Sequence, residues 1–317
     1  MIDWIMSPYV VVVGSSNIDV SIFSKRFPKP GETVTGGIFK QSFGGKGANQ
    51  AIASRRAGSE TFFIGKLGQD SFGQQMIQNF LNEDISTEYI LVDKKEASGV
   101  AFILLNDERQ NMISVAPGAN KNLTVKEILC YKSMIENAAV VIVQMEISTD
   151  VISKIFNLAT NSIKILNPAP FKKLSLELLK KIDIITPNEI ELLDLYNYLE
   201  SKTLTEFSIN ELPKITKAIH QHGIKKIVIT LGKNGCYISD SVNDKRVHVH
   251  GEQVKAQDTV GAGDCFNGVL ASHLCMGEDL KTSAEYANIA ASIAVTKVGA
   301  QISIPYKKEI ETFRNRS

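Results

Sequence analysis

The stretch "YVVVVG" (residues 9–14) is a continuous run of apolar, mostly β-branched residues, and it decides the fold. A strand with one face in water alternates apolar and polar residues, whereas an unbroken apolar run indicates a strand buried on both faces. Five similar runs follow along the chain: "TFFIG" (61–65), "AVVIVQ" (139–144), "IKIL" (163–166), "IDIIT" (182–186) and "KIVITLG" (226–232). We therefore expect a mostly parallel central sheet.

The segments between and after these runs have the apolar spacing of amphipathic helices. Helices are predicted near 47–57, 71–83, 124–137, 149–161, 174–181, 188–200, 209–222, 263–276, 279–297 and 306–315. Strands that alternate with helices build a sheet covered on both faces. The predicted fold class is a three-layer α/β/α fold, with residues 1–317 forming a single domain.

Two segments, 18–43 and 99–116, lack helical spacing and read as strand–turn–strand units, the second turning at Asn106–Arg109. Because they interrupt the strand–helix alternation, we expect them to form a small antiparallel β lid that stands off the main sheet. Such a sheet has an exposed apolar face. Pairing of two lids in a homodimer is therefore a reasonable hypothesis.

The composition excludes several classes of partner. The net charge of +1 over 317 residues gives no electrostatic basis for binding nucleic acid or an anionic membrane. No apolar run approaches the roughly 18 residues of a membrane span. The four cysteines are widely spaced without a CxxC pair, so neither a zinc site nor a disulfide framework is indicated and a cytoplasmic location is expected.

The stretch "AQDTVGAGDCFNGVLASHL" (256–274) places Gly261, Ala262, Gly263 and Asp264 directly before a helical pattern. Helix N-termini carry unpaired amides and attract anions. Two interpretations of Asp264 stay open on the residues alone. It caps the helix, or it takes a proton from an attacking hydroxyl while the 261–263 amides stabilise developing negative charge, as phosphoryl transfer requires.

The stretch "DTVGAGDCF" (258–266) is similar to the second signature of the ribokinase-like (PfkB) carbohydrate kinases, and "FGGKGANQAIASRRAGSETFFIGKLGQDSFG" (43–73) is similar to the first. The resemblance runs from about residue 9 to residue 311. It implies the ribokinase-like fold, with Asp264 as general base and the amides of Gly261, Ala262 and Gly263 as an anion hole. It also implies that ATP phosphorylates the 5-hydroxyl of D-ribose, giving ribose 5-phosphate and ADP.

The resemblance also implies a sugar site, made of Asn17, Asp19, Gly45, Lys46, Asn49, Glu146 and Asp264. Carboxylates that accept and amide or ammonium groups that donate hydrogen bonds suit a polyol with adjacent hydroxyls. Asn17 favours ribose over 2-deoxyribose. A buried polar group that lacks its hydroxyl partner costs about 1–3 kcal/mol.

For the nucleotide, the resemblance assigns Asn188, Thr230, Gly232, Gly235, Gly263 and Asn288, and it assigns Mg²⁺ to Glu191 through water. Acidic residues at a helix start also stabilise the helix dipole, so that alternative stays open for Glu191. The implied potassium loop comprises Asp258, Val260, Ala294, Lys297, Gly299 and Ser303. Oxygen ligands of this kind suit a large, weakly charged cation, although the same residues would also fit an ordinary loop.

Other functions are less consistent with the chain. A kinase acting on 2-deoxyribose or another pentose is the nearest alternative, and adenosine or fructose kinase activity fits less well. An inactive sugar- or nucleotide-binding regulator would be signalled by loss of Asp264 or the glycine turn, and both are present. A dinucleotide-dependent oxidoreductase needs GxGxxG after the first strand, where this chain has "GSSNID" (14–19).

Overall fold

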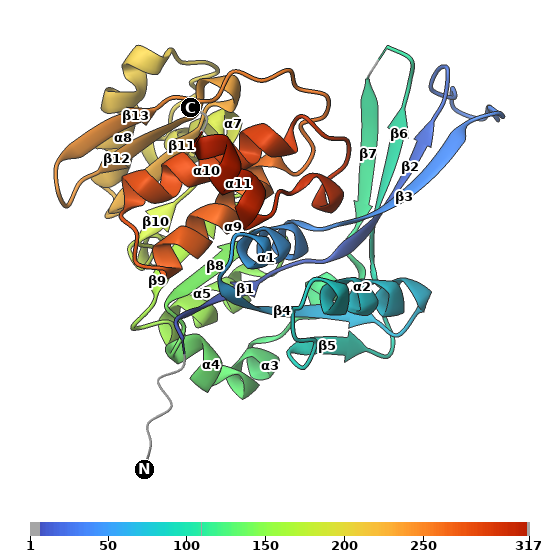
Figure 1. Ribbon diagram of the computed structural model, residues 1–317, viewed down its shortest axis with the longest axis horizontal. Helices are drawn as coiled ribbons and strands as arrows, with labels where there is room; N and C mark the ends of the chain where they lie inside the picture. Colours follow the sequence, from blue (N-terminus) through green and yellow to red (C-terminus); the bar gives the residue numbers. More distant parts are fainter. Residues whose placement is uncertain (1–6, 109, 316–317) are drawn as a thin grey trace.

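The computed structural model describes residues 7–108 and 110–315, which form a large central sheet flanked by helices and a smaller sheet beside it (Figure 1). The nine strands of the central sheet lie in the order β13 (Lys245–Val249), β12 (Cys236–Asp240), β11 (Lys226–Thr230), β10 (Ile184–Ile185), β9 (Ile163–Asn167), β8 (Val140–Gln144), β1 (Tyr9–Val13), β4 (Glu60–Gly68) and β5 (Ile90–Asp93). All neighbours from β11 to β5 pair in parallel, and β12 runs antiparallel to both β11 and β13. The expected mostly parallel sheet is confirmed.

Helices cover both faces of this sheet. One face carries α1 (Lys46–Arg56), α2 (Ser71–Asn82), α9 (Ala262–Cys275), α10 (Leu280–Ala294) and α11 (Lys307–Arg314). The other carries α3 (Val125–Cys130), α4 (Lys132–Glu136), α5 (Thr149–Leu158), α6 (Leu176–Leu179), α7 (Glu189–Glu200) and α8 (Leu212–His220). The expected three-layer architecture is confirmed. The helix predicted over 124–137 is broken at Tyr131, and the one over 174–181 is a single turn.

Strand β1 shows why its sequence is continuously apolar. Val10 and Val12 pack into one hydrophobic core, whereas Val11 and Val13 pack into the other, and all four side chains are completely buried. A polar residue at any of these positions would be buried without water. Within the described residues, no helix has the length and apolar character needed to cross a membrane.

Strand β5 was not predicted from the sequence. It has only four residues, lies at the edge of the sheet, and leaves Val92 nearly half exposed. A short strand at a sheet edge shows neither the unbroken apolar run of a central strand nor a clear alternation.

The smaller sheet contains both segments expected to form the lid. Its order is β3 (Ile38–Gly44), β2 (Asn17–Phe23), β6 (Gly99–Leu105) and β7 (Asn111–Ala116). The expected antiparallel pairing holds between β2 and β3 and between β6 and β7, but the central pair, β2 with β6, is parallel. Each hairpin has a local signal in the sequence, which predicts the antiparallel pairing within it. The pairing of one hairpin with the other depends on contacts between distant residues, so the local pattern does not predict its direction. Arg109, predicted in the second turn, lies outside the described residues.

Helices α1 and α9 pack unusually close because a glycine lies between them. A Cβ atom added at Gly268 of α9 would lie 2.3 Å from the carbonyl oxygen of Gln50 and 2.5 Å from the Cβ of Ala53, both on α1. Real Cβ atoms do not approach backbone atoms this closely, so Gly268 sets the separation of the two helices.

We predict that Gly268→Ala lowers the free energy of unfolding by about 1–3 kcal/mol, because the added methyl group overpacks the α1–α9 contact. Urea denaturation measures the change. Gly263→Ala is the matched control on the same helix, where an added Cβ meets nothing within 4 Å. A Gly268→Ala protein as stable as the parent would show that the two helices can move apart at no cost.

Candidate active site

A polar cavity of about 210 Å³ lies at the carboxyl ends of the parallel strands, where open α/β sheets bind ligands. Strands β9 and β11 and the starts of α1, α7 and α9 all contribute to it. Its lining comprises Lys46, Asn167, Ala169, Thr186, Asn188, Glu191, Thr230, Thr259, Gly261, Gly263, Asp264 and Asn267.

The start of α9 places Asp264 inside the molecule. Gly261 precedes the helix with φ at 75°, a left-handed conformation that favours glycine, and no side chain caps the helix. Asp264 is only 6% exposed, and its two oxygens accept hydrogen bonds from side chains of α1. Asn49 Nδ2 lies 2.8 Å from Oδ2 and Gln50 Nε2 lies 3.1 Å from Oδ1. The carboxylate is therefore held towards α1 rather than used as a helix cap.

The three residues predicted as an anion hole differ in their surroundings. Gly261 and Gly263 line the cavity, whereas the Ala262 amide donates to the carbonyl of Thr259 at 3.3 Å. The first-turn amides of a helix have no intrahelical acceptors. The role of all three as an anion hole stays a prediction.

Lys46, the first residue of α1, is the cation at the centre of the acidic side chains of the site. Attraction to Asp264 raises the pKa of Lys46 most strongly, with weaker contributions from Glu146 and Glu191, while burial acts in the opposite direction. The ammonium group therefore stays charged and can face anionic groups of a ligand.

Asp19 on β2 is held in an environment that disfavours its charge. Burial raises the pKa of its carboxyl to about 7, helped by repulsion from Glu146 and Asp264. Glu146 itself accepts hydrogen bonds from the Ser15 hydroxyl and, at 3.2 Å, from the backbone amide of Lys46. Three carboxyl groups that the sequence spreads over 245 positions are thus close enough to interact.

Two asparagine side chains carry unused hydrogen-bonding capacity. Asn17 is 4% exposed, and its Oδ1 accepts from Asn120 Nδ2 at 2.8 Å, so its own amide nitrogen is the end that can donate to a ligand. The buried Asn49 Oδ1 has no partner among the described residues. Both groups suit a ligand that carries hydroxyls. Gly45, which precedes α1 with φ at 87°, lies against the backbone of Ser16 and Asn17.

Asn188 and Glu191 line the cavity and also cap α7. The backbone amide of Asn188 donates to Glu191 Oε2 at 2.9 Å, and the backbone amide of Glu191 donates to Asn188 Oδ1 at 2.8 Å. Burial raises the pKa of Glu191. The helix-stabilising interpretation is therefore correct, and it leaves one oxygen of Glu191 for other partners.

Thr230 of β11 and Gly263 are the other predicted nucleotide residues that line the cavity, whereas Gly232, Gly235 and Asn288 are not among its lining residues. Gly235 has a structural reason to be glycine, because an added Cβ would lie 2.2 Å from the Val249 carbonyl oxygen. The Asn288 amide donates to the same carbonyl at 3.1 Å. Their contact with a nucleotide stays a prediction.

Asp258 joins two segments that carry most of the predicted potassium residues. Its Oδ1 accepts from the Val260 amide at 3.0 Å and its Oδ2 accepts from the Gly299 amide at 2.8 Å. The second segment also touches the start of α9, since an added Cβ at Gly261 would lie 3.1 Å from the Cα of Ala300. The remaining members are placed as follows: Ala294 ends α10, Lys297 pairs with Glu309, and the Ser303 hydroxyl donates to the carbonyl of Ala300.

Sequence reasoning missed five residues of the cavity: Asn167, Ala169, Thr186, Thr259 and Asn267. Asn167 and Thr186 had a readable signal, because each is a polar residue directly at the carboxyl end of a buried apolar run. Asn267 had none, because an asparagine one turn into a helix is common on any polar face.

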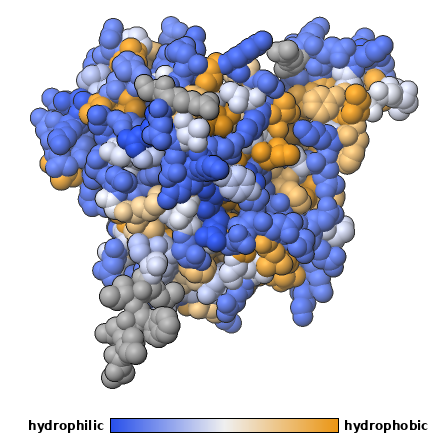
Figure 2. Space-filling view, in the orientation of Figure 1, coloured by the Kyte–Doolittle hydropathy of each residue, from blue (hydrophilic) through white to orange (hydrophobic). Residues whose placement is uncertain are grey.

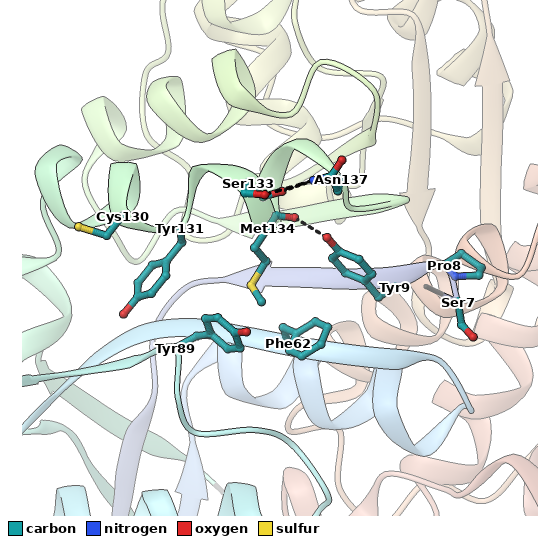
Figure 3. Close-up of a pocket in the computed structure, with 10 residues that line it drawn as sticks. All are labelled: Ser7, Pro8, Tyr9, Phe62, Tyr89, Cys130, Tyr131, Ser133, Met134 and Asn137. Atoms are coloured by element: carbon teal, nitrogen blue, oxygen red, sulfur yellow. Dashed lines mark hydrogen bonds between the residues drawn. The ribbon is translucent and has the colours of Figure 1, made fainter. Parts of the chain in front are cut away.

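A larger cavity of about 600 Å³ lies at the opposite end of the sheet, beside the start of β1 (Figure 3). The rings of Tyr9, Phe62, Tyr89 and Tyr131 follow one another edge to face along it, with centroids 5.2 to 5.6 Å apart. None of the predicted site residues lines this cavity. Seven of the predicted site residues line the smaller, polar one: Lys46, Asn188, Glu191, Thr230, Gly261, Gly263 and Asp264. The other predicted sugar residues, Asn17, Asp19, Gly45, Asn49 and Glu146, are not among its lining residues.

Residues 7–307 match the model of the pfkB family carbohydrate kinases. The chain is 38% identical over 309 residues to the ribokinase of Staphylococcus aureus (strain COL), covering 96% of this chain and 99% of the relative, and 30% identical over 302 residues to the deoxyribokinase of Salmonella typhi, covering 93% and 95%. The structure resembles that of Arabidopsis thaliana ribokinase complexed with ribose and ATP, with a TM-score of 0.87 at 28% identity, covering 97% of this chain and 99% of that one.

We predict that the Asp19 carboxyl titrates near pH 7, and that Glu146→Gln lowers its pKa without restoring the ordinary value, because burial remains. Carbon-13 NMR of the carboxyl region measures the titration, with Asp19→Asn identifying the signal. Titration near pH 4 in the parent protein would contradict the prediction.

The raised pKa of Asp19 also makes the free energy of unfolding depend on pH. Because the folded state holds the Asp19 proton more tightly than the unfolded chain, this group favours folding below about pH 4, and that contribution is lost as the pH rises through about 7. Asp19→Asn should remove this part of the pH dependence of urea unfolding.

Proposed function

Because the chain belongs to the pfkB family of carbohydrate kinases, we propose that it is a ribokinase, which transfers the γ-phosphoryl group of ATP to the 5-hydroxyl of D-ribose. The observation that carries the proposal is the Asp264 carboxylate, buried at the start of α9 and held by two amides of α1 at the edge of a polar cavity. The products are ribose 5-phosphate and ADP.

Asp264 acts as general base in this proposal. The O–H bond of the 5-hydroxyl breaks as its proton passes to the carboxylate, and the oxygen forms a bond to the γ-phosphorus. The bond between the γ-phosphorus and the bridging oxygen breaks, and its electron pair leaves on ADP. The amides of residues 261–263 stabilise the negative charge that develops on the transferred group.

The sugar occupies the space bounded by Asn17, Asp19, Lys46, Asn49 and Glu146. Support comes from the unpartnered Asn49 Oδ1 and from the Asn17 amide nitrogen, which can both bind hydroxyls. Hydroxyls that donate to Asp19 favour its anionic form, so sugar binding releases a proton near neutral pH.

On the nucleotide side, Asn188 and Thr230 contact ATP, together with Gly232, Gly235 and Asn288 in the family assignment. Among residues 7–108 and 110–315, no group of three or more His, Cys, Asp or Glu side chains could hold a metal ion. Mg²⁺ would therefore be held by the nucleotide phosphates, water and Glu191, and it would supply charge neutralisation at the phosphates.

We propose that a monovalent cation binds between the two segments joined by Asp258, beside the start of α9. Bound there, K⁺ would stiffen the turn that presents the 261–263 amides. The contact between Gly261 and Ala300 supports this coupling.

A 2-deoxyribose kinase is the second candidate, favoured by the similarity to a deoxyribokinase. Asn17 argues for ribose, because its buried amide would lose a hydroxyl partner on the deoxy sugar, at a cost of about 1–3 kcal/mol.

A second copy of the chain covers the lid in this proposal. Large apolar side chains are 41–71% exposed there: Phe23, Ile38, Phe39, Phe102, Met112, Ile113 and Val115. Apolar surface is visible over these strands in Figure 2. The strand register pairs Val115 with Ala101 and Ala101 with Asp19, so the exposed apolar side chains on the face of Asp19 are Phe23, Ile38, Ile113 and Val115. Phe39, Phe102 and Met112 lie on the opposite face. Clustered apolar exposure of this kind marks an interface.

We also propose that the protein works in the cytoplasm. All four cysteines lie within the described residues as free thiols, which suits a reducing compartment.

We predict that the protein produces ADP from MgATP with the highest kcat/KM on ribose among ribose, 2-deoxyribose, fructose and adenosine. Asp264→Asn should lose activity by about 10²-fold or more, because general base catalysis is removed. A coupled ADP assay measures the sugar preference and the effect of Asp264→Asn. The same assay with and without K⁺ tests the proposed monovalent cation, which should raise kcat/KM. A preference for 2-deoxyribose would overturn the interpretation of Asn17, and an Asp264→Asn protein as active as the parent would overturn the base assignment.

We predict that Ile113→Glu converts a dimer of twice the 34.8 kDa chain mass into a monomer, because a charge is buried in the lid interface. Sedimentation velocity measures the mass. Val242→Glu is the control, because Val242 is 65% exposed in the turn between β12 and β13, away from the lid. A parent protein that sediments as a monomer would refute the lid dimer.

A further inference from the structure

Gln50 is a completely buried residue of α1 that none of the site assignments includes. Its Nε2 donates to Asp264 Oδ1 and to Asn167 Oδ1, both at 3.1 Å. Its Oε1 accepts from Gln144 Nε2 at 2.6 Å. A glutamine that uses both ends of its amide in the interior is held in one orientation.

The groups at the ends of this network determine which way the amide faces. A carboxylate can only accept, so Gln50 must present its nitrogen to Asp264. Asn167 in turn donates its Nδ2 to the backbone carbonyl of Thr186 at 3.0 Å, which leaves its oxygen to accept from Gln50. Neither amide can be reversed without facing acceptor against acceptor.

The hydrogen bonds continue from Thr186 to the first turn of α9, which carries Asp264. The Thr186 hydroxyl donates to Asn267 Oδ1 at 2.6 Å, and Asn267 Nδ2 donates to the Gly263 carbonyl at 2.9 Å. Gln50 therefore belongs to a continuous chain of hydrogen bonds that joins α1 to the first turn of α9.

The two oxygens of Asp264 differ in what holds them. Oδ1 is bound by Gln50, which is fully buried. Oδ2 is bound by Asn49, whose own Oδ1 has no partner and which borders the proposed sugar site. A hydroxyl that reaches Oδ2 can take the place of the Asn49 donor, whereas no ligand reaches Gln50.

We propose that Gln50 is the positioning residue of the catalytic base: it holds Oδ1 of Asp264 in the interior and so turns Oδ2 towards the acceptor hydroxyl. This inference rests on the proposed function, because it needs Asp264 to be the base. It predicts that Gln50 affects kcat and the pH profile rather than sugar affinity.

The test uses the full-length protein with MgATP and ribose. Gln50→Leu removes the donor without adding charge, and kcat should fall about 10- to 100-fold while KM for ribose changes less than threefold. Gln50→Glu places a second carboxyl group against Asp264. The coupled pair should shift the acidic limb of the kcat/KM profile upward by about one pH unit or more.

Ser54→Ala is the matched control, because Ser54 is also completely buried on α1 but bonds to Thr61 rather than to the site. It should leave kcat and the pH profile unchanged, and thermal unfolding of all three variants checks that they are folded. In an Asp264→Asn background, Gln50→Leu should cause no further loss of kcat, because Gln50 acts only through the Asp264 carboxylate.

The proposal is overturned if both Gln50 variants keep kcat within twofold and an unshifted pH profile, or if Gln50→Leu lowers kcat equally in the Asp264→Asn background. The second result would assign Gln50 to packing of the fold. If Asp264→Asn itself keeps parental activity, the proposed function fails first. If Asp264→Asn is inactive while the Gln50 variants behave as the parent, only the positioning role fails.

Discussion

The rest of the site depends on two hydrogen bonds to the Asp264 carboxylate of α9, donated by the side-chain amides of Asn49 and Gln50 on α1. They require the two helices to lie closer than side chains normally allow, and Gly268 makes that possible. The sheet supplies the support beneath them, because Gln144 and Asn167 end strands β8 and β9 directly below Gln50. A buried carboxylate without such donors would tend to be protonated and would lose its function as a base.

Charge balance in the cavity follows from the same arrangement. Asp264, Glu146 and Glu191 all attract one cation, Lys46, and Glu146 and Asp264 also repel the carboxyl group of Asp19, so carboxyl groups outnumber cations in the site before any ligand binds. Because the raised pKa leaves the Asp19 carboxyl partly uncharged near neutral pH, its repulsion by Glu146 and Asp264 is reduced. In the proposed reaction, metal-bound nucleotide and sugar hydroxyls would supply the remaining partners.

The lid sheet carries residues of the proposed sugar site and also exposes apolar side chains. Strand β2 carries Asn17 and Asp19 next to the cavity, while its neighbours leave apolar side chains exposed further along. Helix α2 contacts only part of this sheet, at β2 and β3, and the rest is left without a covering helix. Its outer part therefore needs another surface, and in the proposed dimer a second lid provides it.

The sequence by itself determined the parallel sheet and its helices, because unbroken β-branched runs and helical apolar spacing are local consequences of burial. It also pointed to Asp264 and the glycine turn, through a short motif whose chemistry can be read residue by residue. It could not show that α1 meets α9, since Asn49 and Asp264 are 215 positions apart and a single glycine decides their separation. The parallel β2–β6 pair, the pKa of Asp19 and the position of Gln50 were likewise decided only by the tertiary structure, because hydrogen bonding and burial depend on neighbours that the local pattern does not contain.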